Sequence, residues 1–263
     1  MVKPRLCFTL LYADGVFHLS RNFTLQAVGN YDWLLSNYDF ELMARSIDDL
    51  IILNVTRGEP DWPEFLGTIK RIVNNCFMPV AIGGGIRTVD HARSLFDSGA
   101  DKLVLNSAFF DNPLLVESLA GSYGYQSIVA SLDIRRNEWG ATELFIDGGS
   151  TKVGVPLIDA VKNVARLGAG EIYLTSIDRD GTGMGYDLEA LRNVFESCDL
   201  PIIASGGADT ADQLTEGIKS GFVSAVSTSH LFNFMGDGLH HAREEMTKAN
   251  IPLSYWNFNE LLN

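Results

Sequence analysis

Residues 79–110 read PVAIGGGIRTVDHARSLFDSGADKLVLNSAFF, and they align without gaps on residues 201–232, which read PIIASGGADTADQLTEGIKSGFVSAVSTSHLF. About ten of the roughly 32 aligned positions are identical. The interval between the two copies is much longer than the roughly 20–50 residues that separate solenoid repeats. The pattern therefore predicts a duplicated half-domain, with halves at about residues 1–122 and 123–250.

Short runs rich in β-branched residues alternate with amphipathic segments along the chain. The runs predict eight strands, at residues 5–11, 50–54, 80–83, 102–105, 127–133, 171–176, 201–204 and 224–227. The segments between them predict helices that begin near Tyr31, Trp62, Val89, Pro113, Leu157, Asp187, Ala211 and Gly236. Such alternation is typical of parallel strands joined by crossover helices. With the two-fold repeat, it predicts an α/β fold, a single (β/α)8 TIM barrel that forms one domain over residues 1–263.

Two of the expected connections are long, and each follows the first strand of a half. Residues 12–31 contain the hairpin signal Asp14-Gly15, and residues 134–156 contain Gly148-Gly149. Long loops of this kind carry substrate recognition at the C-terminal face of a barrel. We therefore expect both connections beside a ligand site.

The composition limits the partners of the protein. Its 263 residues carry a net charge of −13, which argues against nucleic acid or an anionic membrane as a general partner. Three cysteines without metal-ligand spacing favour buried thiols in a reducing cytoplasm. No secretion signal and no apolar run of about 20 residues is present. We expect a cytoplasmic protein that uses no metal and no cofactor, and any phosphate it binds must be held locally.

Two glycine runs lie at repeat-related strand ends, each beside a polar strand end. Glycine lets backbone N–H groups approach an anion, and a following helix N-terminus favours negative charge. Tight βα turns also need glycine, so one run alone would mean little. The pair indicates a ligand with a phosphate at each end, and the strand seven–eight side is the commoner phosphate position in this fold. The candidate residues are Gly84, Gly85, Asn106, Ser107, Asp180, Gly181, Gly206, Gly207, Thr228 and Ser229.

Asp133 ends the fifth predicted strand, where strand-end residues of a barrel are often catalytic. It can also be a helix cap or a partner of Arg135 or Arg136. The repeat places Leu11 at the equivalent position of the first half, and a leucine cannot transfer a proton. Loss of one positioned acid–base group typically costs ~10²–10⁴ in rate. Asp14 reads first as a turn residue, so we expect any mechanism with two carboxylates to be impaired.

Four charged residues begin predicted strands at the opposite end of the barrel: Arg5, Asp49, Lys102 and Glu171. Pointing inward, they would form two acid–base pairs. Structural salt bridges are one interpretation. The other is a gate for a small polar molecule, because buried ion pairs add little net stability against their desolvation cost.

The chain resembles the cyclase subunit of imidazole glycerol phosphate synthase, the HisF type, from about residue 5 to residue 234. The motifs that carry the resemblance are GGGIRTVDHARSLFDSGADK, LNSAFFDNP, LGAGEIYLTSIDRDGTGMGYDLE and PIIASGGA. The resemblance implies a class I glutaminase partner at the N-terminal barrel face and ammonia that enters through a four-residue gate, here Arg5, Asp49, Lys102 and Glu171. It implies a bisphosphorylated substrate held at the glycine runs, and it places Asp133 at one of two catalytic aspartates.

The departures from that family lie at the catalytic face. Leu11 stands at the other catalytic aspartate, Leu19 replaces a lysine of the first loop, and Asn54 replaces an aspartate. This pattern is similar to paralogues associated with sugar amidation in surface-polysaccharide or nonulosonic-acid pathways. The resemblance then implies a subunit that passes ammonia to a sugar amidotransferase. An active cyclase of histidine biosynthesis is the alternative. A sister sugar-phosphate isomerase is disfavoured, because it needs two carboxylates and lacks the gate.

Overall fold

The computed structural model describes residues 3–254, so the predicted domain of residues 1–263 extends at both ends beyond the described part. Within residues 3–254, eight parallel strands pair side by side, and β10 pairs with β7 to close them into a ring. The fold is the predicted (β/α)8 TIM barrel. In ring order the strands are β1 (Arg5–Ala13), β4 (Asp49–Asn54), β5 (Val80–Gly83), β6 (Lys102–Leu105), β7 (Ile128–Arg136), β10 (Glu171–Ser176), β11 (Ile202–Ser205) and β12 (Ala225–Thr228).

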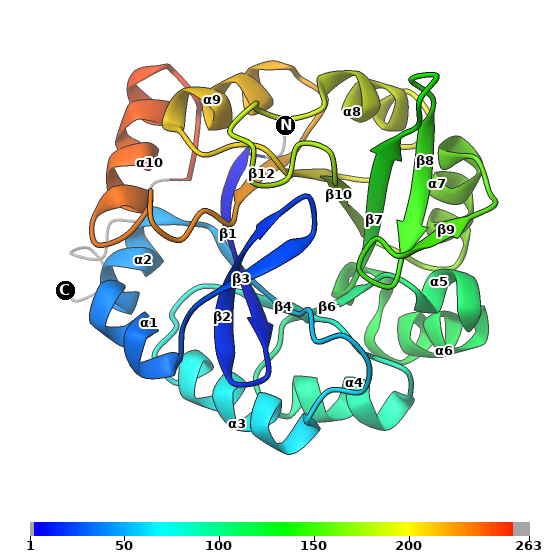
Figure 1. Ribbon diagram of the computed structural model, residues 1–263, viewed down its shortest axis with the longest axis horizontal. Coiled ribbons are helices and arrows are strands. Elements are labelled where there is room, and N and C mark those ends of the chain that lie inside the picture. The colour runs from blue at the N-terminus through cyan, green and yellow to red at the C-terminus, as the bar shows by residue number, and fades with distance from the viewer. Residues whose placement is uncertain (1–2, 255–263) are drawn as a thin grey trace.

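Helices surround the strand ring on its outer side (Figure 1). Most begin where the sequence predicts, but α2 and the short α5 were not predicted, and α10 begins two residues after the predicted Gly236. None of the helices within the described residues is long and apolar enough to cross a membrane. The helices are α1 (Tyr31–Asn37), α2 (Phe40–Ser46), α3 (Trp62–Val73), α4 (Val89–Phe96), α5 (Ala108–Asp111), α6 (Pro113–Tyr123), α7 (Leu157–Arg166), α8 (Leu188–Phe195), α9 (Ala211–Lys219) and α10 (Gly238–Lys248).

The internal repeat extends to the way its helices begin. Thr88 caps α4 by accepting a hydrogen bond from the backbone N–H of His91. Thr210 caps α9 in the same way, with the N–H of Gln213 as donor. A threonine hydroxyl satisfies one of the unpaired N–H groups at a helix start. The two capping threonines are equivalent in the alignment of the halves, so the repeat preserves local structure as well as sequence.

The two long connections are antiparallel hairpins rather than irregular loops. β2 (Val16–Arg21) and β3 (Thr24–Gly29) follow β1, while β8 (Thr142–Ile146) and β9 (Thr151–Val153) follow β7. The expected Asp14-Gly15 turn joins β1 to β2, and both of its residues have positive φ, +49° and +79°. Figure 1 shows the β2–β3 hairpin lying across the middle of the strand ring, which places it over the ends of the barrel strands.

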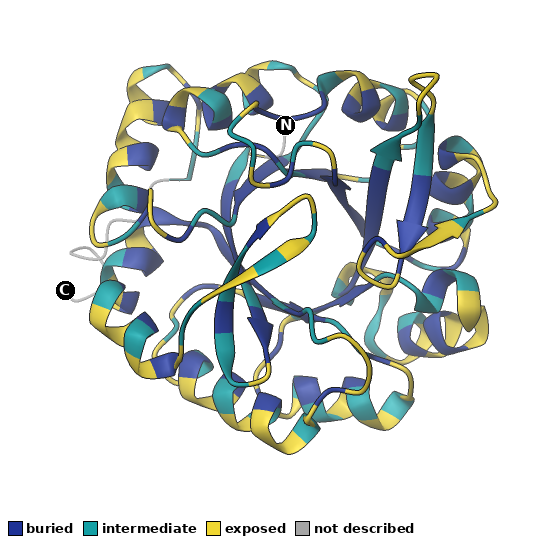
Figure 2. Ribbon diagram, viewed as in Figure 1, coloured by how far each residue is buried: buried dark blue, intermediate teal, exposed yellow. Residues whose placement is uncertain are grey.

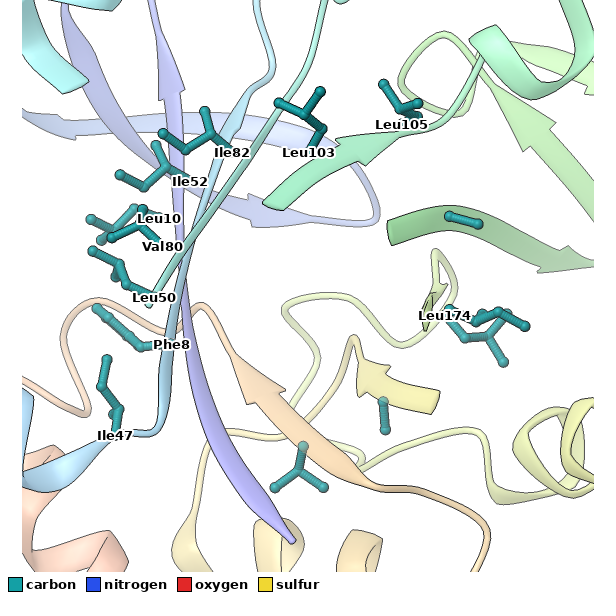
Figure 3. Packing of buried hydrophobic residues seen from close by; sticks show 14 of the residues in the cluster. Phe8, Leu10, Ile47, Leu50, Ile52, Val80, Ile82, Leu103, Leu105 and Leu174 are labelled. Carbon is teal, nitrogen blue, oxygen red and sulfur yellow. The ribbon is translucent and has the colours of Figure 1, made fainter. Parts of the chain in front are cut away.

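Alternate residues of each barrel strand face opposite sides, and they form two separate hydrophobic clusters. Outward-facing residues such as Phe8, Leu10 and Ile52 pack beneath the helices (Figure 3). The smaller cluster fills the barrel interior with Cys7, Ile51, Ala81, Val104, Val129, Tyr173, Ile203 and Ala225. Figure 2 shows the barrel strands almost wholly buried, with exposed residues on the outer helix faces and on the hairpins at the rim. The interior of the barrel is therefore filled by side chains rather than being an open pore.

Candidate functional site

A cavity of about 650 Å³ opens at the C-terminal ends of the barrel strands. Its volume lies in the range of sites for small organic ligands, roughly 300–1,000 Å³. Leu11, Asn54, Asp133 and Thr175 line it from four different strands, and Phe23 lines it from the β2–β3 hairpin. This end of a (β/α)8 barrel is where active sites of the fold are built.

Asp133 is a buried acid in the lining of the cavity, with 8% of its surface exposed. The Asn106 side-chain amide donates to its Oδ2 at 3.2 Å, and the Ser131 hydroxyl lies 3.5 Å from its Oδ1. Burial raises the pKa of Asp133 to about 7; the Ser131 hydrogen bond opposes this rise and the Asp180 charge adds to it. Such a carboxyl can gain or lose a proton near neutral pH.

The sequence left open whether Asp133 pairs with a neighbouring arginine. Arg136 instead donates to Asp187 at 2.9 Å and to Glu189 at 2.9 Å. The Arg135 guanidinium lies over the Phe145 ring, 4.6 Å from its centroid. Both arginines thus have other partners, and Asp133 keeps its carboxylate turned toward the cavity.

Leu11 lies on the opposite side of the same cavity. Its strand, β1, is four places from β7 in the eight-strand ring, so Leu11 and Asp133 belong to facing walls. Leu11 is level with Leu53 of β4, and both side chains line the cavity. At the level of Leu11 and Leu53 the wall is therefore apolar, whereas the wall at β7 carries a carboxyl group.

Asp180, which follows β10, is a second buried carboxylate in the lining. Its Oδ2 accepts hydrogen bonds from the Ser20 hydroxyl at 2.5 Å and from the Phe23 N–H at 3.1 Å. Burial raises the pKa of Asp180, and these two donors oppose the rise. The carboxylate thus holds the β2–β3 hairpin over the cavity, on the same side of the barrel as Asp133 rather than at the position of Leu11.

The candidate phosphate residues gather in two groups, which we call the first and second cradles. The first comprises Gly84, Gly85, Asn106 and Ser107, and all four line the large cavity. Gly84 has φ +95°, and a Cβ there would lie 1.9 Å from the Asn54 carbonyl oxygen, so only glycine fits. The second cradle comprises Gly181, Gly206, Gly207, Thr228 and Ser229, which line a separate pocket of about 20 Å³. Asp180 lies outside that pocket.

The four charged residues at the strand starts form one connected cluster. Arg5 donates to Asp49 at 2.5 Å and also to Glu171, while the Lys102 ammonium lies 2.9 Å from the other Glu171 oxygen. Burial lowers the pKa of Arg5, but the Glu171 and Asp49 charges outweigh it and raise that pKa overall. Burial raises the pKa of Asp49, against the opposing charges of Arg5 and Lys102. The geometry agrees with either of the two interpretations of this cluster.

Sequence reasoning missed a polar belt that crosses the barrel between its two ends. The Tyr173 phenol is 3.0 Å from the Thr9 hydroxyl and accepts from Ser205 at 2.7 Å. Thr9 also lies 2.7 Å from the Ser227 hydroxyl. A signal was available, because Arg5, Thr9 and Leu11 alternate on one face of β1, as do Glu171 and Tyr173 on β10.

Arg57 was also missed, although it lines the mouth of the cavity. Its guanidinium donates to the backbone carbonyls of Asp147 at 2.9 Å, Gly148 at 2.8 Å and Phe23 at 3.1 Å. Arg57 therefore connects the β2–β3 hairpin with the turn between β8 and β9. Contacts to carbonyl oxygens leave no trace in a sequence pattern.

Among residues 3–254, no group of three or more histidine, cysteine, aspartate or glutamate side chains is arranged to hold a metal ion. The arrangement offers instead one carboxyl group with a pKa near neutrality, a second tied to the hairpin, and two glycine cradles. Those features suit proton transfer on an anionic organic ligand.

Two comparisons place the chain among known proteins. A family model described as "Histidine biosynthesis protein" matches residues 39–235. A protein of Parasynechococcus marenigrum (strain WH8102), named "Putative imidazole glycerol phosphate synthase subunit hisF2", is 41% identical over 257 residues. That alignment covers 97% of this chain and 95% of the relative.

Proposed function

Because this chain belongs to the histidine biosynthesis protein family, as a HisF-like synthase subunit of the imidazole glycerol phosphate synthase type, we propose that it conducts ammonia for another enzyme and has lost efficient cyclase chemistry. In this proposal a partner glutaminase docks at the strand starts. Ammonia then passes along the barrel axis to the mouth and serves a sugar amidotransferase of surface-polysaccharide or nonulosonic-acid synthesis.

One observation carries the proposal: Leu11 lines the cavity on the wall that faces Asp133. A cyclisation that needs a positioned acid and a positioned base has only one of them in this arrangement. The roughly 10²–10⁴ in rate that such a group supplies would be lost. All four members of the charged cluster at the other end are in contact, so the loss of functional groups is confined to the mouth.

The barrel interior supports passage of a small neutral molecule. At the charged cluster is a void of about 10 Å³, lined on one side by Asp49, Lys102 and Glu171 and on the other by apolar residues that include Ile51, Val104, Val129 and Ile203. This volume is about that of one water molecule. The apolar residues disfavour ammonium, because an unpaired charge is costly to bury, and they tolerate uncharged ammonia.

The cyclase assay tests the proposal most directly. The purified protein is incubated with an ammonium salt and the bisphosphorylated cyclase substrate, and imidazole glycerol phosphate is measured. We expect turnover at least about a hundredfold below that of a HisF enzyme assayed in parallel, because one acid–base group is missing. Turnover at the rate of that enzyme would contradict the proposal.

A second experiment addresses the charged cluster. Lys102→Ala removes the ammonium that contacts Glu171. With a cognate glutaminase and the sugar amidotransferase present, the variant should change the ratio of glutamine hydrolysed to nitrogen incorporated into the sugar. Lys248→Ala, at an exposed position on α10, is the matched control. An unchanged ratio in the Lys102 variant would indicate that the four residues of the charged cluster have only a structural role.

An active cyclase remains the second candidate, and one observation favours it. Asp180 lines the cavity beside Asp133 and could supply a second carboxyl group if the hairpin released it. The two functions differ in the effect of Asp180→Asn. An active cyclase that uses this group would lose most of its turnover with ammonium salts, whereas a conduit subunit has no such turnover to lose.

A further inference from the structure

Two barrel strands that are equivalent in the internal repeat, β4 and β10, present different side chains to the barrel interior. Each begins with an acid of the charged cluster. Toward the mouth, the next inward-facing residues of β4 are Ile51 and Leu53. On β10 the equivalent residues are Tyr173 and Thr175. The two strands are four places apart in the ring and so face each other, with β4 apolar beyond its acid and β10 polar throughout.

The polar residues of β10 connect the two ends of the barrel. Glu171 lines the void at the charged cluster, and Thr175 lines the large cavity. Tyr173 lies between them on the same face of the strand, because alternate residues of a strand point to the same side. Thr175 is level with Asp133 of the neighbouring strand β7, whose pKa is about 7. Polar groups therefore follow one side of the interior from the charged cluster to Asp133.

The polar belt lies on this path. It consists of the hydroxyl groups of Thr9, Tyr173, Ser205 and Ser227. Tyr173 is level with Ile203 of β11, and its ring belongs to the apolar cluster inside the barrel. Its phenol oxygen extends to the Ser205 hydroxyl, two residues closer to the mouth, and lines the large cavity. A small molecule that moves along β10 toward the cavity therefore meets this phenol.

The belt can bind such a molecule by exchanging hydrogen bonds, because its hydroxyl groups are bonded to one another. Thr9 lies 3.0 Å from the Tyr173 phenol oxygen and 2.7 Å from the Ser227 hydroxyl. Each hydroxyl can donate and accept. Ammonia has one lone pair and three N–H groups, so it can accept from one hydroxyl and donate to another. Ammonium has no lone pair and would bring an unpaired charge into a buried layer.

We infer that the polar belt is a transit site for one molecule of uncharged ammonia, which accepts a hydrogen bond from the Tyr173 phenol. Ammonia then moves along β10 past Thr175 and enters the cavity beside Asp133. This role rests on the proposed function, because it specifies the route and the binding site of the ammonia that the barrel conducts.

Ammonia binding is tested on the protein alone by NMR. Ammonium chloride is titrated into full-length protein that contains carbon-13-labelled tyrosine, at about pH 7 and at about pH 9, with potassium chloride as the salt control. Burial raises the pKa of Tyr173, although its hydrogen bonds with Ser205 and Thr9 oppose the rise, so the phenol keeps its proton at both values.

The Tyr173 ring signals, assigned by their loss in Tyr173→Phe, should shift with the concentration of uncharged ammonia. The signals of Tyr31, whose phenol donates to the Arg71 carbonyl in the helical layer, should not shift. Constant Tyr173 signals, or a shift that follows total ammonium at both pH values, would overturn the assignment of the belt.

A coupled assay tests whether the belt controls transit. Tyr173→Phe keeps the ring and removes the hydroxyl. With a cognate glutaminase and the sugar amidotransferase present, the nitrogen incorporated per glutamine hydrolysed should fall about fivefold, roughly the contribution of one neutral hydrogen bond. Tyr31→Phe is the matched control, because it also loses one phenol hydrogen bond, between α1 and α3, and should leave the ratio unchanged.

The two measurements separate the role of the belt from the proposed function. If the wild type incorporates no nitrogen from glutamine, the conduit function fails, and the NMR titration still decides whether the belt binds ammonia. If the wild type incorporates nitrogen and Tyr173→Phe does so at the same ratio, the conduit function stands and the transit site at Tyr173 is refuted.

Discussion

The two ends of the barrel interior contrast sharply, although the same strands build both. At the strand starts, Arg5 and Lys102 contact Asp49 and Glu171, so each charge has a partner. At the strand ends, Asp133 faces Leu11 across the cavity and its pKa is raised to about 7. An apolar cluster and the belt around Tyr173 lie between them. The contrast shows that layers of barrel residues can change separately, because each layer has its own contacts.

The largest expected effect comes from breaking the charged end. Glu171→Ala removes a carboxylate whose side chain is 6% exposed and which contacts both cations. The free energy of unfolding should fall by about 3–5 kcal/mol, since Arg5 and Lys102 are left with less compensation. Urea denaturation measures the change, and Glu196→Ala, at an exposed position, is the control. A loss below about 1 kcal/mol would show that the cluster behaves like a surface salt bridge.

The mouth should respond to pH in a way that identifies Asp133. Its pKa is about 7 in the folded protein against 3.8 for an ordinary aspartate, so the folded state binds the proton more tightly. The free energy of unfolding should therefore decrease between about pH 4 and pH 7, by at most about 4 kcal/mol from this group, and become level above pH 7. Urea denaturation across this range compares the wild type with Asp133→Asn.

In Asp133→Asn this contribution disappears, while the other acidic groups titrate as before. The difference in stability between the two proteins should therefore increase from pH 4 to pH 7 in favour of the variant. A difference that does not depend on pH would mean that Asp133 is ionised throughout the range.

Restoring a carboxylate opposite Asp133 would make the two ends more alike. Leu11→Asp should increase cyclase turnover with ammonium salts about a hundredfold, the lower limit of what a positioned acid–base group contributes. The variant and the wild type are compared in the assay for imidazole glycerol phosphate. An unchanged turnover would argue against Leu11 as the position of the missing acid–base group.

The smallest effect is expected in the layer between the two ends. Tyr173→Phe removes the phenol that contacts Thr9 and Ser205 and should lower the free energy of unfolding by about 1 kcal/mol. The pH dependence due to Asp133 should persist, because its hydrogen-bond partners are Asn106 and Ser131. A changed pH profile would show that the two ends communicate through this layer.

The sequence predicts the barrel and the position of Leu11 well, because both follow from the internal repeat. Val80–Gly83, Lys102–Leu105 and Glu171–Ser176 have the predicted bounds. The hairpin strands were missed because β3 is short, largely exposed and paired only with β2, so it lacks the alternation of a half-buried strand. α2 was missed although Asp39, its capping residue, gave a start signal.

The site was predictable only in part. Alternation on β1 and β10 places Thr9 and Tyr173 in the interior, but their contact depends on strands that the chain brings together by closing the ring. The raised pKa of Asp133 comes mainly from burial, which depends on the whole fold around the cavity. The packing at Gly181 depends on how the hairpin folds back onto it, and no local pattern encodes that contact.

Arg57 has a consequence for the motion of the rim. Its guanidinium holds carbonyl groups of two hairpins that are far apart in sequence, at Phe23 and at Asp147 and Gly148. Segments linked in this way open together as one cooperative unit, and their backbone amides exchange with solvent deuterium at a common opening rate. Arg57 would thus make the two hairpins open and close together rather than separately.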